Sequence, residues 1–347
     1  MERQQKVKEA LYLFLLQKRE ENELSQAFTA YNTRIVTPPH GSMLPTSPVR
    51  KNIFMVAFAL GLLIPIVIIF MRENMNTRVR GRKDLENLTI PFIGEIPLFT
   101  RKKKGILGKK PQEVKAVIVK EGNRDIINEA FRVLRTNLEF MTGKDKTSNV
   151  IIMTSFNPGS GKSFLTMNIA MSLAIKGKKV LVIDGDLRHA SASSYIDSPD
   201  KGLSDYLGGR IDNLDEIIVP DPKHKSMDIL PVGTIPPNPT ELLFDERLKQ
   251  TIDTVREQYD YVLIDCPPVE LVADTQIIEK LADRTVFVVR AGLLERSMLA
   301  ELEKIYEEKK YKNMSLILNG TEGSGGRYGY RYGYRYGYHY GYGSGYH

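Results

Sequence analysis

The sequence predicts an α/β fold, in which a mostly parallel sheet carries helices on both faces and follows a single transmembrane helix. Two observations predict it. Beyond residue 123, short apolar runs alternate with stretches of helical character, the order typical of parallel sheets covered by helices. Before them, residues 53–71 form an uncharged run rich in Ile, Leu, Phe and Val. At 1.5 Å per residue this run covers roughly 28 Å, close to the ~30 Å hydrocarbon core of a bilayer.

The chain before this run divides into two predicted regions. Residues 1–36 are predicted to be mainly helical, because Leu11, Leu15 and Leu24 recur among Gln, Lys and Glu at near-helical spacing. Residues 37–52 are a proline-rich segment that ends this helix. Pro65 lies inside the run 53–71, where a membrane helix tolerates it.

Basic residues are concentrated after the apolar run. Arg34, Arg50 and Lys51 precede it, and the flank that follows has Arg72, Arg78, Arg80, Arg82 and Lys83. The more basic side of a span stays cytoplasmic. We therefore expect the first helix to be periplasmic, residues 72–122 to be a cytoplasmic basic linker, and residues 123–320 to be a cytoplasmic domain.

The predicted strands of this domain are short apolar segments. They are Asn149–Thr154, Lys179–Ile183, Met227–Leu230, Tyr261–Ile264, Thr285–Val289 and Ser315–Leu318. Several of them run into polar residues where a parallel strand would reach the carboxyl edge of its sheet, the edge at which α/β folds bind ligands.

The first strand runs into a glycine-rich loop that opens a helix, the context that makes a P-loop credible. Backbone N–H groups of such a loop bind phosphate oxygens, Lys162 is predicted to reach the β- and γ-phosphates, and Ser163 to bind Mg²⁺. Phe156 occupies the place of the first glycine of the motif G-x-x-x-x-G-K-[ST]. The fold is therefore P-loop NTPase-like, with ATP and Mg²⁺ as expected ligands. The predicted nucleotide-binding residues are Pro158, Gly159, Ser160, Gly161, Lys162, Ser163, Phe164 and Asn319.

Three aspartates follow predicted strands and complete the predicted catalytic set with Lys162. Asp184 and Asp186 follow one strand and Asp265 another. Mg²⁺ prefers oxygen ligands and keeps several waters, so one or two carboxylates suffice for it. We assign Mg²⁺ to Ser163, Asp186 and Asp265, directly or through water. Asp184 is the candidate base that accepts a proton from the incoming hydroxyl.

The chain ends in a run of tyrosines that alternate mostly with glycine. Residues 321–347 can bury no core and are predicted to be a flexible tail. A Mg-ATP site and a string of phenol hydroxyls together predict tyrosine phosphorylation between copies of the chain; the alternative is an aromatic low-complexity segment that adheres to other chains. The predicted phosphate acceptors are Tyr328, Tyr330, Tyr332, Tyr334, Tyr336, Tyr338, Tyr340, Tyr342 and Tyr346.

Composition excludes some classes of site. The chain has a net charge of +7, and its basic residues are concentrated in the tail and in a linker cluster that includes residues 101–104. That cluster favours either attraction to anionic lipid or a solvated segment, and disfavours nucleic acid. Cys266 is the only cysteine, so no intramolecular disulfide is possible. The five histidines show no ligand spacing, and no zinc site is predicted.

These motifs resemble those of the bacterial tyrosine kinases (BY-kinases) of the Wzc type. The segments IDGDLR and VLIDCPP resemble the family's aspartate motifs, GTIPPNPTELL (Gly233–Leu243) resembles a further family segment, and a tyrosine cluster closes the chain. The proline-rich segment resembles the one before the second membrane span of polysaccharide co-polymerases. The family has a first span and a large periplasmic domain before this point, so the chain resembles a fragment that begins in the last periplasmic helix.

The resemblance implies an inner-membrane tyrosine autokinase that regulates assembly and export of capsular or exopolysaccharide. Glu129, Arg132 and Arg135 fit the family's E-x-x-R-x-x-R helix, which implies subunit contacts in a ring with the tail acting in trans. Implied partners are the membrane, a polysaccharide polymerase or outer-membrane exporter and a tyrosine phosphatase, with no nucleic acid. Alternatives are a MinD/ParA-like ATPase, disfavoured because Asn157 stands where such ATPases have a lysine, and a polysaccharide-export scaffold.

Overall fold

The computed structural model of the chain describes residues 2–28, 41, 49–99, 116–143, 148–222, 224–269 and 273–322. They belong to two compact units, Met1–Asn74 and Met75–His347. The predictions for most of the proline-rich segment, for the basic cluster of the linker and for the tail tyrosines fall outside the described residues.

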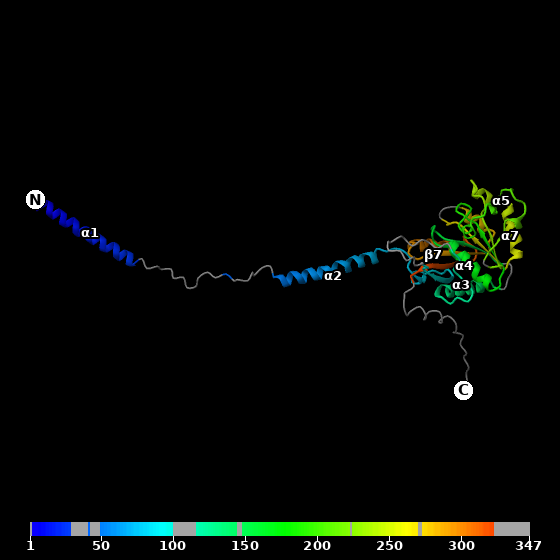
Figure 1. Cartoon of the computed structure of the whole chain (residues 1–347), viewed down its shortest axis with the longest axis horizontal. Coiled ribbons are helices and arrows are strands. Elements are labelled where there is room, and N and C mark those ends of the chain that lie inside the picture. The colour runs from blue at the N-terminus through cyan, green and yellow to red at the C-terminus, as the bar shows by residue number, and fades with distance from the viewer. Residues whose placement is uncertain are drawn as a thin grey trace, which may run out of the picture. The chain divides into compact units, whose positions relative to one another are not determined.

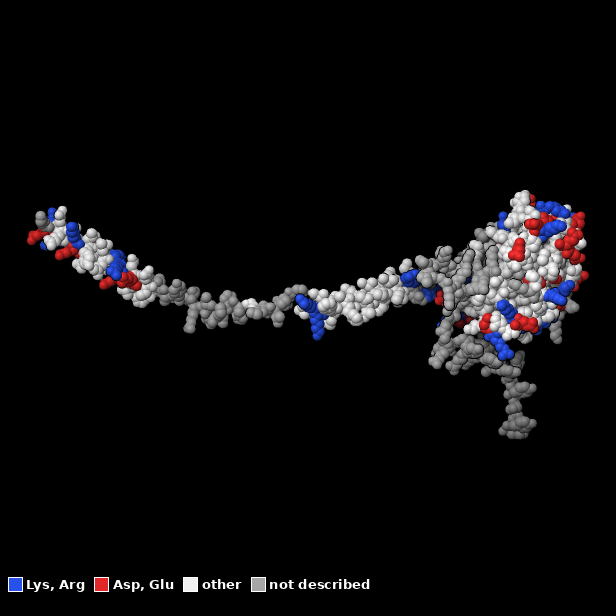
Figure 2. Space-filling view, viewed as in Figure 1, with Lys and Arg blue, Asp and Glu red and all other residues white. Residues whose placement is uncertain are grey.

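The first unit contains two long helices, α1 (Glu2–Phe28) and α2 (Arg50–Asn74). Apolar side chains of α1, such as Leu11 and Phe14, are exposed. Helix α2 continues through Pro65. Figure 2 shows it as a white helix with blue Lys and Arg side chains only near its ends. Within the described residues, α2 is the one helix long and apolar enough to cross a membrane.

The second unit is built on an eight-stranded sheet of order β1-β8-β7-β2-β6-β3-β5-β4. All neighbouring strands are parallel except β4 and β5, which are antiparallel. The predicted mostly parallel sheet is thus confirmed. The strands are β1 (Phe92–Pro97), β2 (Val150–Thr154), β3 (Val180–Asp184), β4 (Val219–Pro220), β5 (Met227–Leu230), β6 (Tyr261–Asp265), β7 (Arg284–Arg290) and β8 (Ser315–Thr321).

Helices cover both faces of this sheet (Figure 1), because its central strands are apolar on both sides. Ile151 of β2 belongs to the apolar cluster that includes α3 and α4, whereas its neighbour Ile152 belongs to the cluster that includes α7 and α9. The longer helices are α3 (Ile126–Thr142), α4 (Lys162–Ile175), α7 (Glu246–Gln258) and α9 (Met298–Glu307); the shorter ones are α5 (Leu203–Leu207), α6 (Pro239–Leu243) and α8 (Asp274–Glu279).

The structure differs from the prediction in the segment that follows α2. Residues 75–99, expected to be part of a linker, pack against the sheet. Strand β1 pairs in parallel with β8, and its Ile93 and Ile96 are buried. In the loop after β7, the Leu294 carbonyl accepts from the Val79 N–H and the Gly292 N–H donates to the Val79 carbonyl, while the Thr77 carbonyl accepts from the Arg296 N–H. Prolines at either end of β1 hid the strand in the sequence, but an edge strand tolerates them because one of its sides needs no partner.

Candidate active site

The glycine-rich loop connects β2 to α4 and depends on two glycines with positive φ. Gly159 has a φ of 73° and Gly161 a φ of 86°. A Cβ on Gly161 would lie 2.2 Å from Nδ2 of Asn319, so no other residue fits there. The Asn319 amide in turn donates to the Ser160 carbonyl at 2.8 Å. Asn319, near the end of β8, therefore fixes the loop that opens α4.

Phe156 replaces the first glycine of the motif by packing into the core. Its side chain is buried, and its ring meets that of Phe287 edge to face with centroids 4.9 Å apart. Its backbone is not in the positive-φ region, so this position has no need of glycine. The departure from the motif leaves the rest of the loop intact.

Lys162 begins α4 and is 9 % exposed. Its Nζ lies 3.4 Å from Oγ of Ser155. Burial lowers the pKa of the Lys162 ammonium, while the charges of Asp265 and Asp186 raise it in part. These two carboxylates therefore offset part of the cost of burying the lysine.

A pocket of about 400 Å³ opens in front of the loop. It brings together most of the predicted nucleotide-binding residues. Ser160 is the exception: it is buried, and its hydroxyl donates to the Asn157 carbonyl at 2.8 Å. The predicted residues that line the pocket are Pro158, Gly159, Gly161, Lys162, Ser163, Phe164, Asp186 and Asn319.

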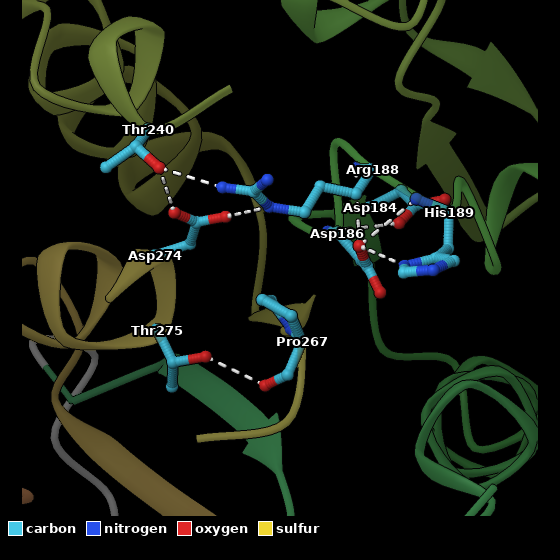
Figure 3. Close-up of polar contacts among 8 residues, drawn as sticks. All are labelled: Asp184, Asp186, Arg188, His189, Thr240, Pro267, Asp274 and Thr275. Atoms are coloured by element: carbon cyan, nitrogen blue, oxygen red, sulfur yellow. Dashed lines mark hydrogen bonds and ion pairs between the residues drawn. The ribbon is translucent and has the colours of Figure 1, made fainter. Parts of the chain in front are cut away.

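The two aspartates after β3 have different surroundings. Asp184 is fully buried, and its Oδ2 accepts bonds of 2.7 Å from both the backbone N–H and the hydroxyl of Ser193. Asp186 lines the pocket, and its Oδ1 lies 3.3 Å from Nδ1 of His189 (Figure 3). The carboxylate of Asp184 is thus engaged inside the fold and does not line the pocket, and the role of base assigned to it stays a prediction.

Asp265 ends β6 and lies behind the pocket, 1 % exposed. Burial and the charge of Asp184 raise its pKa to about 8, although a hydrogen bond from Ser163 and the charge of Lys162 oppose the shift. In the described structure its Oδ1 has no hydrogen-bond partner. An unpartnered carboxylate oxygen beside Ser163 fits a hard cation such as Mg²⁺.

The protein groups alone form only part of a metal site. Within the described ranges, no three His, Cys, Asp or Glu residues converge as metal ligands. A site with so few protein ligands fits Mg²⁺, which is usually held by one or two carboxylates together with waters and substrate phosphates. Of the three predicted ligands, Ser163 and Asp265 are the residues that would hold it, whereas Asp186 lies on the pocket wall.

Part of the pocket wall was not predicted. Arg290 ends β7, and in the register of the sheet it is opposite Asn319. A Cβ on Gly320 would lie 2.7 Å from Arg290 Nε, so this glycine makes room for the guanidinium. Arg290 directly follows the predicted strand Thr285–Val289, and this position was the signal in the sequence that could have identified it as a site residue. Other unpredicted lining residues are Pro97, Leu98, Phe99, His189, Ser191, Tyr195 and Pro268.

The residues predicted to contact neighbouring subunits make contacts within their own chain. Arg132 pairs with Glu129 at 2.9 Å and donates to the Asn123 carbonyl. Arg135 donates to the Ser172 carbonyl at 2.9 Å and joins α3 to α4. Glu129 is exposed on the helix surface, whereas Arg132 and Arg135 are both partly buried.

A parallel sheet with a P-loop after one strand and aspartates at the ends of two others defines the class of P-loop nucleotide-binding proteins. Comparison with known proteins agrees with this. Residues 148–317 match a family model described as an AAA domain, and residues 1–74 match a G-rich domain on putative tyrosine kinase.

The kinase domain of the Escherichia coli tyrosine kinase ETK has a similar structure, with a TM-score of 0.62 and 29 % identity over 76 % of this chain and all of that one. The BceF tyrosine kinase domain gives a TM-score of 0.59 and 30 % identity over 70 % of this chain and 99 % of that one. The chain belongs to the bacterial tyrosine kinase family of the Wzc type.

A curated relative, the putative tyrosine-protein kinase AmsA of Erwinia amylovora, is 32 % identical over 92 % of this chain. The chain spans 45 % of that relative's length. With α2 as a candidate span, the chain fits a membrane-anchored member of the family.

Proposed function

We propose that the chain is an ATP-dependent tyrosine autokinase. The observation that carries the proposal is the pocket in which Lys162 and Ser163 of the P-loop stand beside Asp186, with the unpartnered oxygen of Asp265 behind them. Membership of a tyrosine kinase family and the C-terminal run of tyrosines supply the substrate class.

The P-loop residues are proposed to bind the phosphates of ATP. The backbone around Gly159 and Gly161 presents N–H groups at the start of α4, where the helix adds partial positive charge. Lys162 supplies the cation that faces the transferring phosphate. Ser163 and Asp265 would hold Mg²⁺, which when bound would neutralise charge on the phosphate oxygens.

We propose that Asp186, not Asp184, faces the incoming tyrosine hydroxyl. Asp186 lines the pocket, whereas the carboxylate of Asp184 accepts a hydrogen bond from the Ser193 hydroxyl. Asp184 then acts as an anchor for the loop that carries Asp186. Phosphoryl transfer passes through a loose transition state, so positioning of the hydroxyl contributes more than its deprotonation.

The acceptor is proposed to be the tail of a neighbouring subunit, with α3 at the contact between subunits. Beside the predicted Glu129, Arg132 and Arg135, helix α3 exposes three apolar side chains at seven-residue intervals, which places them on one face. They are Ile126, Val133 and Phe140, which are 77 %, 51 % and 80 % exposed. An apolar stripe with charged neighbours is suited to a second copy of the chain.

The setting of this reaction is also a proposal. The excess of basic residues after α2 supports a cytoplasmic kinase unit and a periplasmic α1. We propose that phosphorylation regulates assembly and export of a capsular or extracellular polysaccharide, together with a polymerase or exporter and a phosphatase that resets the tail.

Mass spectrometry of the tail after incubation with Mg-ATP tests the proposed activity. Phosphate is expected on tyrosines between Tyr328 and Tyr346, and none when Mg²⁺ is chelated. Hydrolysis of ATP without phosphotyrosine would instead support an ATPase of the MinD/ParA kind.

A further inference from the structure

Two consecutive residues at the start of α8 hold the two loops that carry or follow the proposed catalytic carboxylates. The loop after β3 carries Asp186, and the loop after β6 follows directly on Asp265. Asp274 contacts the first loop and Thr275 the second (Figure 3). The two loops therefore share one support.

Asp274 holds the first loop through Arg188, two residues after Asp186. Arg188 Nε donates to Asp274 Oδ2 at 3.1 Å, and Arg188 Nη2 donates to Thr240 Oγ1 at 3.0 Å. The Thr240 hydroxyl donates to Asp274 Oδ1 at 2.6 Å and closes a ring of three side chains. Asp274 is 1 % exposed. Loss of Arg188 would leave a buried carboxylate without its cation, so the ring resists opening.

Thr275 holds the second loop through a backbone carbonyl. Its hydroxyl donates to the Pro267 carbonyl at 2.8 Å, and the Thr154 hydroxyl at the end of β2 donates to the same oxygen at 2.9 Å. Pro267 and Pro268 have no N–H to donate, so these two residues cannot donate backbone hydrogen bonds. The N–H groups of Cys266 and Val269, on either side, donate to carbonyls at the end of β2. Between them the Pro267 carbonyl accepts the two threonine hydroxyls, and Pro268 lines the pocket.

We propose that Asp274 and Thr275 are positioning residues that set the distance between Asp186 and Asp265. This inference rests on the proposed function and deepens it. Neither residue lines the pocket, so each acts through another group: Asp274 through Arg188, and Thr275 through Pro267. A misplacement of about 1 Å in a catalytic arrangement can cost roughly 10²-fold in rate.

The test compares Thr275→Val with Thr275→Ser and with a matched control, Thr251→Val. Thr251 is 1 % exposed in α7, and its hydroxyl donates to the Arg247 carbonyl, away from the site. Binding of fluorescent ADP is titrated with Mg²⁺. Thr275→Val is expected to raise the half-saturating Mg²⁺ concentration about tenfold, the lower end of what removal of an outer-shell partner costs. Thr275→Ser keeps the hydroxyl and is expected to restore the wild-type value.

A second pair of variants keeps the test decisive if Thr275→Val folds poorly. Thr154→Val removes the other donor to the Pro267 carbonyl, and Asp274→Asn weakens the hold on Arg188. Both are expected to lower kcat for tail phosphorylation more than they change KM for ATP, with melting temperatures close to that of Thr251→Val.

The outcomes separate this inference from the proposed function. Absence of phosphotyrosine in the wild type would overturn the proposed function, while the ADP titration would still decide the role of Thr275. Mg²⁺ titrations of Thr275→Val and Thr154→Val that coincide with that of Thr251→Val would overturn the positioning role.

Discussion

Asp184 and Asp265 lie opposite each other at the ends of the paired strands β3 and β6, and both are buried. Their surroundings differ, because Asp184 accepts hydrogen bonds from Ser193 whereas Oδ1 of Asp265 has no partner in the described part of the chain. After burial, the charge of Asp184 is the largest cause that raises the pKa of Asp265. The carboxylate of Asp184 is thus hydrogen-bonded inside the fold, whereas Asp265 keeps an oxygen that can bind a cation.

The stability of the metal-free chain is expected to fall as pH rises from about 4 to about 8. The pKa of Asp265 is raised from 3.8 to about 8 and that of Asp184 to about 6, mainly by burial. Between the unfolded and folded pKa values the folded state binds more protons, so unfolding becomes easier as pH increases. Urea unfolding at a series of pH values with a chelator present measures this slope.

Asp265→Asn is the matched variant for this experiment, because an amide cannot ionise. Its stability should depend less on pH between 4 and 8 than that of the wild type. Mg²⁺ with ADP should recover stability at pH 8 in the wild type only, because ligands that bind the folded state stabilise it by mass action. A wild-type chain whose stability rises over this range would contradict the raised pKa values.

Lys162→Met is expected to abolish tail phosphorylation. The substitution removes the buried cation that faces the phosphates and preserves an unbranched side chain at the start of α4. Loss of one such electrostatic contact typically costs about 10²–10³-fold in rate. Anti-phosphotyrosine blots measure the effect, with the exposed Lys249→Met of α7 as the control. Near-normal phosphorylation of Lys162→Met would refute the assignment of the P-loop.

The three aspartates should separate in binding and kinetic assays. Asp265→Asn should raise the Mg²⁺ concentration needed for nucleotide binding, since it removes a proposed metal ligand. Asp186→Asn should retain nucleotide binding and lose phosphoryl transfer. Asp184→Asn should lose only about tenfold in transfer, because its effect passes through the loop that carries Asp186. If Asp184→Asn eliminated transfer while Asp186→Asn did not, the original assignment of Asp184 as base would stand.

Helix α3 should mediate contacts between copies of the chain. Alanine at Glu129, Arg132 and Arg135 is expected to shift the assembly towards monomer and to reduce phosphorylation in trans; Phe140→Ser is expected to act in the same direction by removing exposed apolar surface. Light scattering reports the mass. Triple alanine at the exposed Lys249, Asp253 and Glu257 of α7 is the matched control. An equal mass for the α3 and α7 variants would make the α3 charges a solvated helix face.

The tail tyrosines are expected to control assembly as well as to accept phosphate. Each phosphate adds about −1.5 to −2 charges at neutral pH, which should repel the tail from the aspartates of the site. Phenylalanine at all nine predicted acceptors should leave ATP binding unchanged, remove most phosphotyrosine and keep the assembled state. If this variant still dispersed on addition of Mg-ATP, the tail would not be the switch.

Features that depend only on residues close together in the sequence could be predicted without knowledge of the tertiary structure. The uncharged run 53–71, the alternation of strands and helices, and the loop Pro158–Ser163 each follow from local spacing and composition. Hydrophobic period and glycine placement act over a few residues, so the sequence predicted that Lys162 would begin a helix after a buried strand. The ends of β3 and β6 were likewise predicted to bring aspartates to one edge, and the parallel register places Asp184 opposite Asp265.

Only the tertiary structure decided which polar groups face the pocket. Asp184 and Asp186 are two residues apart in similar local sequence, but Ser193 takes up the carboxylate of the first and leaves the second on the pocket wall. The hydrogen bond from Thr275 to the Pro267 carbonyl and the pairing of β1 with β8 could likewise not be predicted from the sequence alone. Burial and hydrogen-bond partners come from segments far apart in the chain, and they determine whether a carboxylate anchors a loop or remains free to bind a cation.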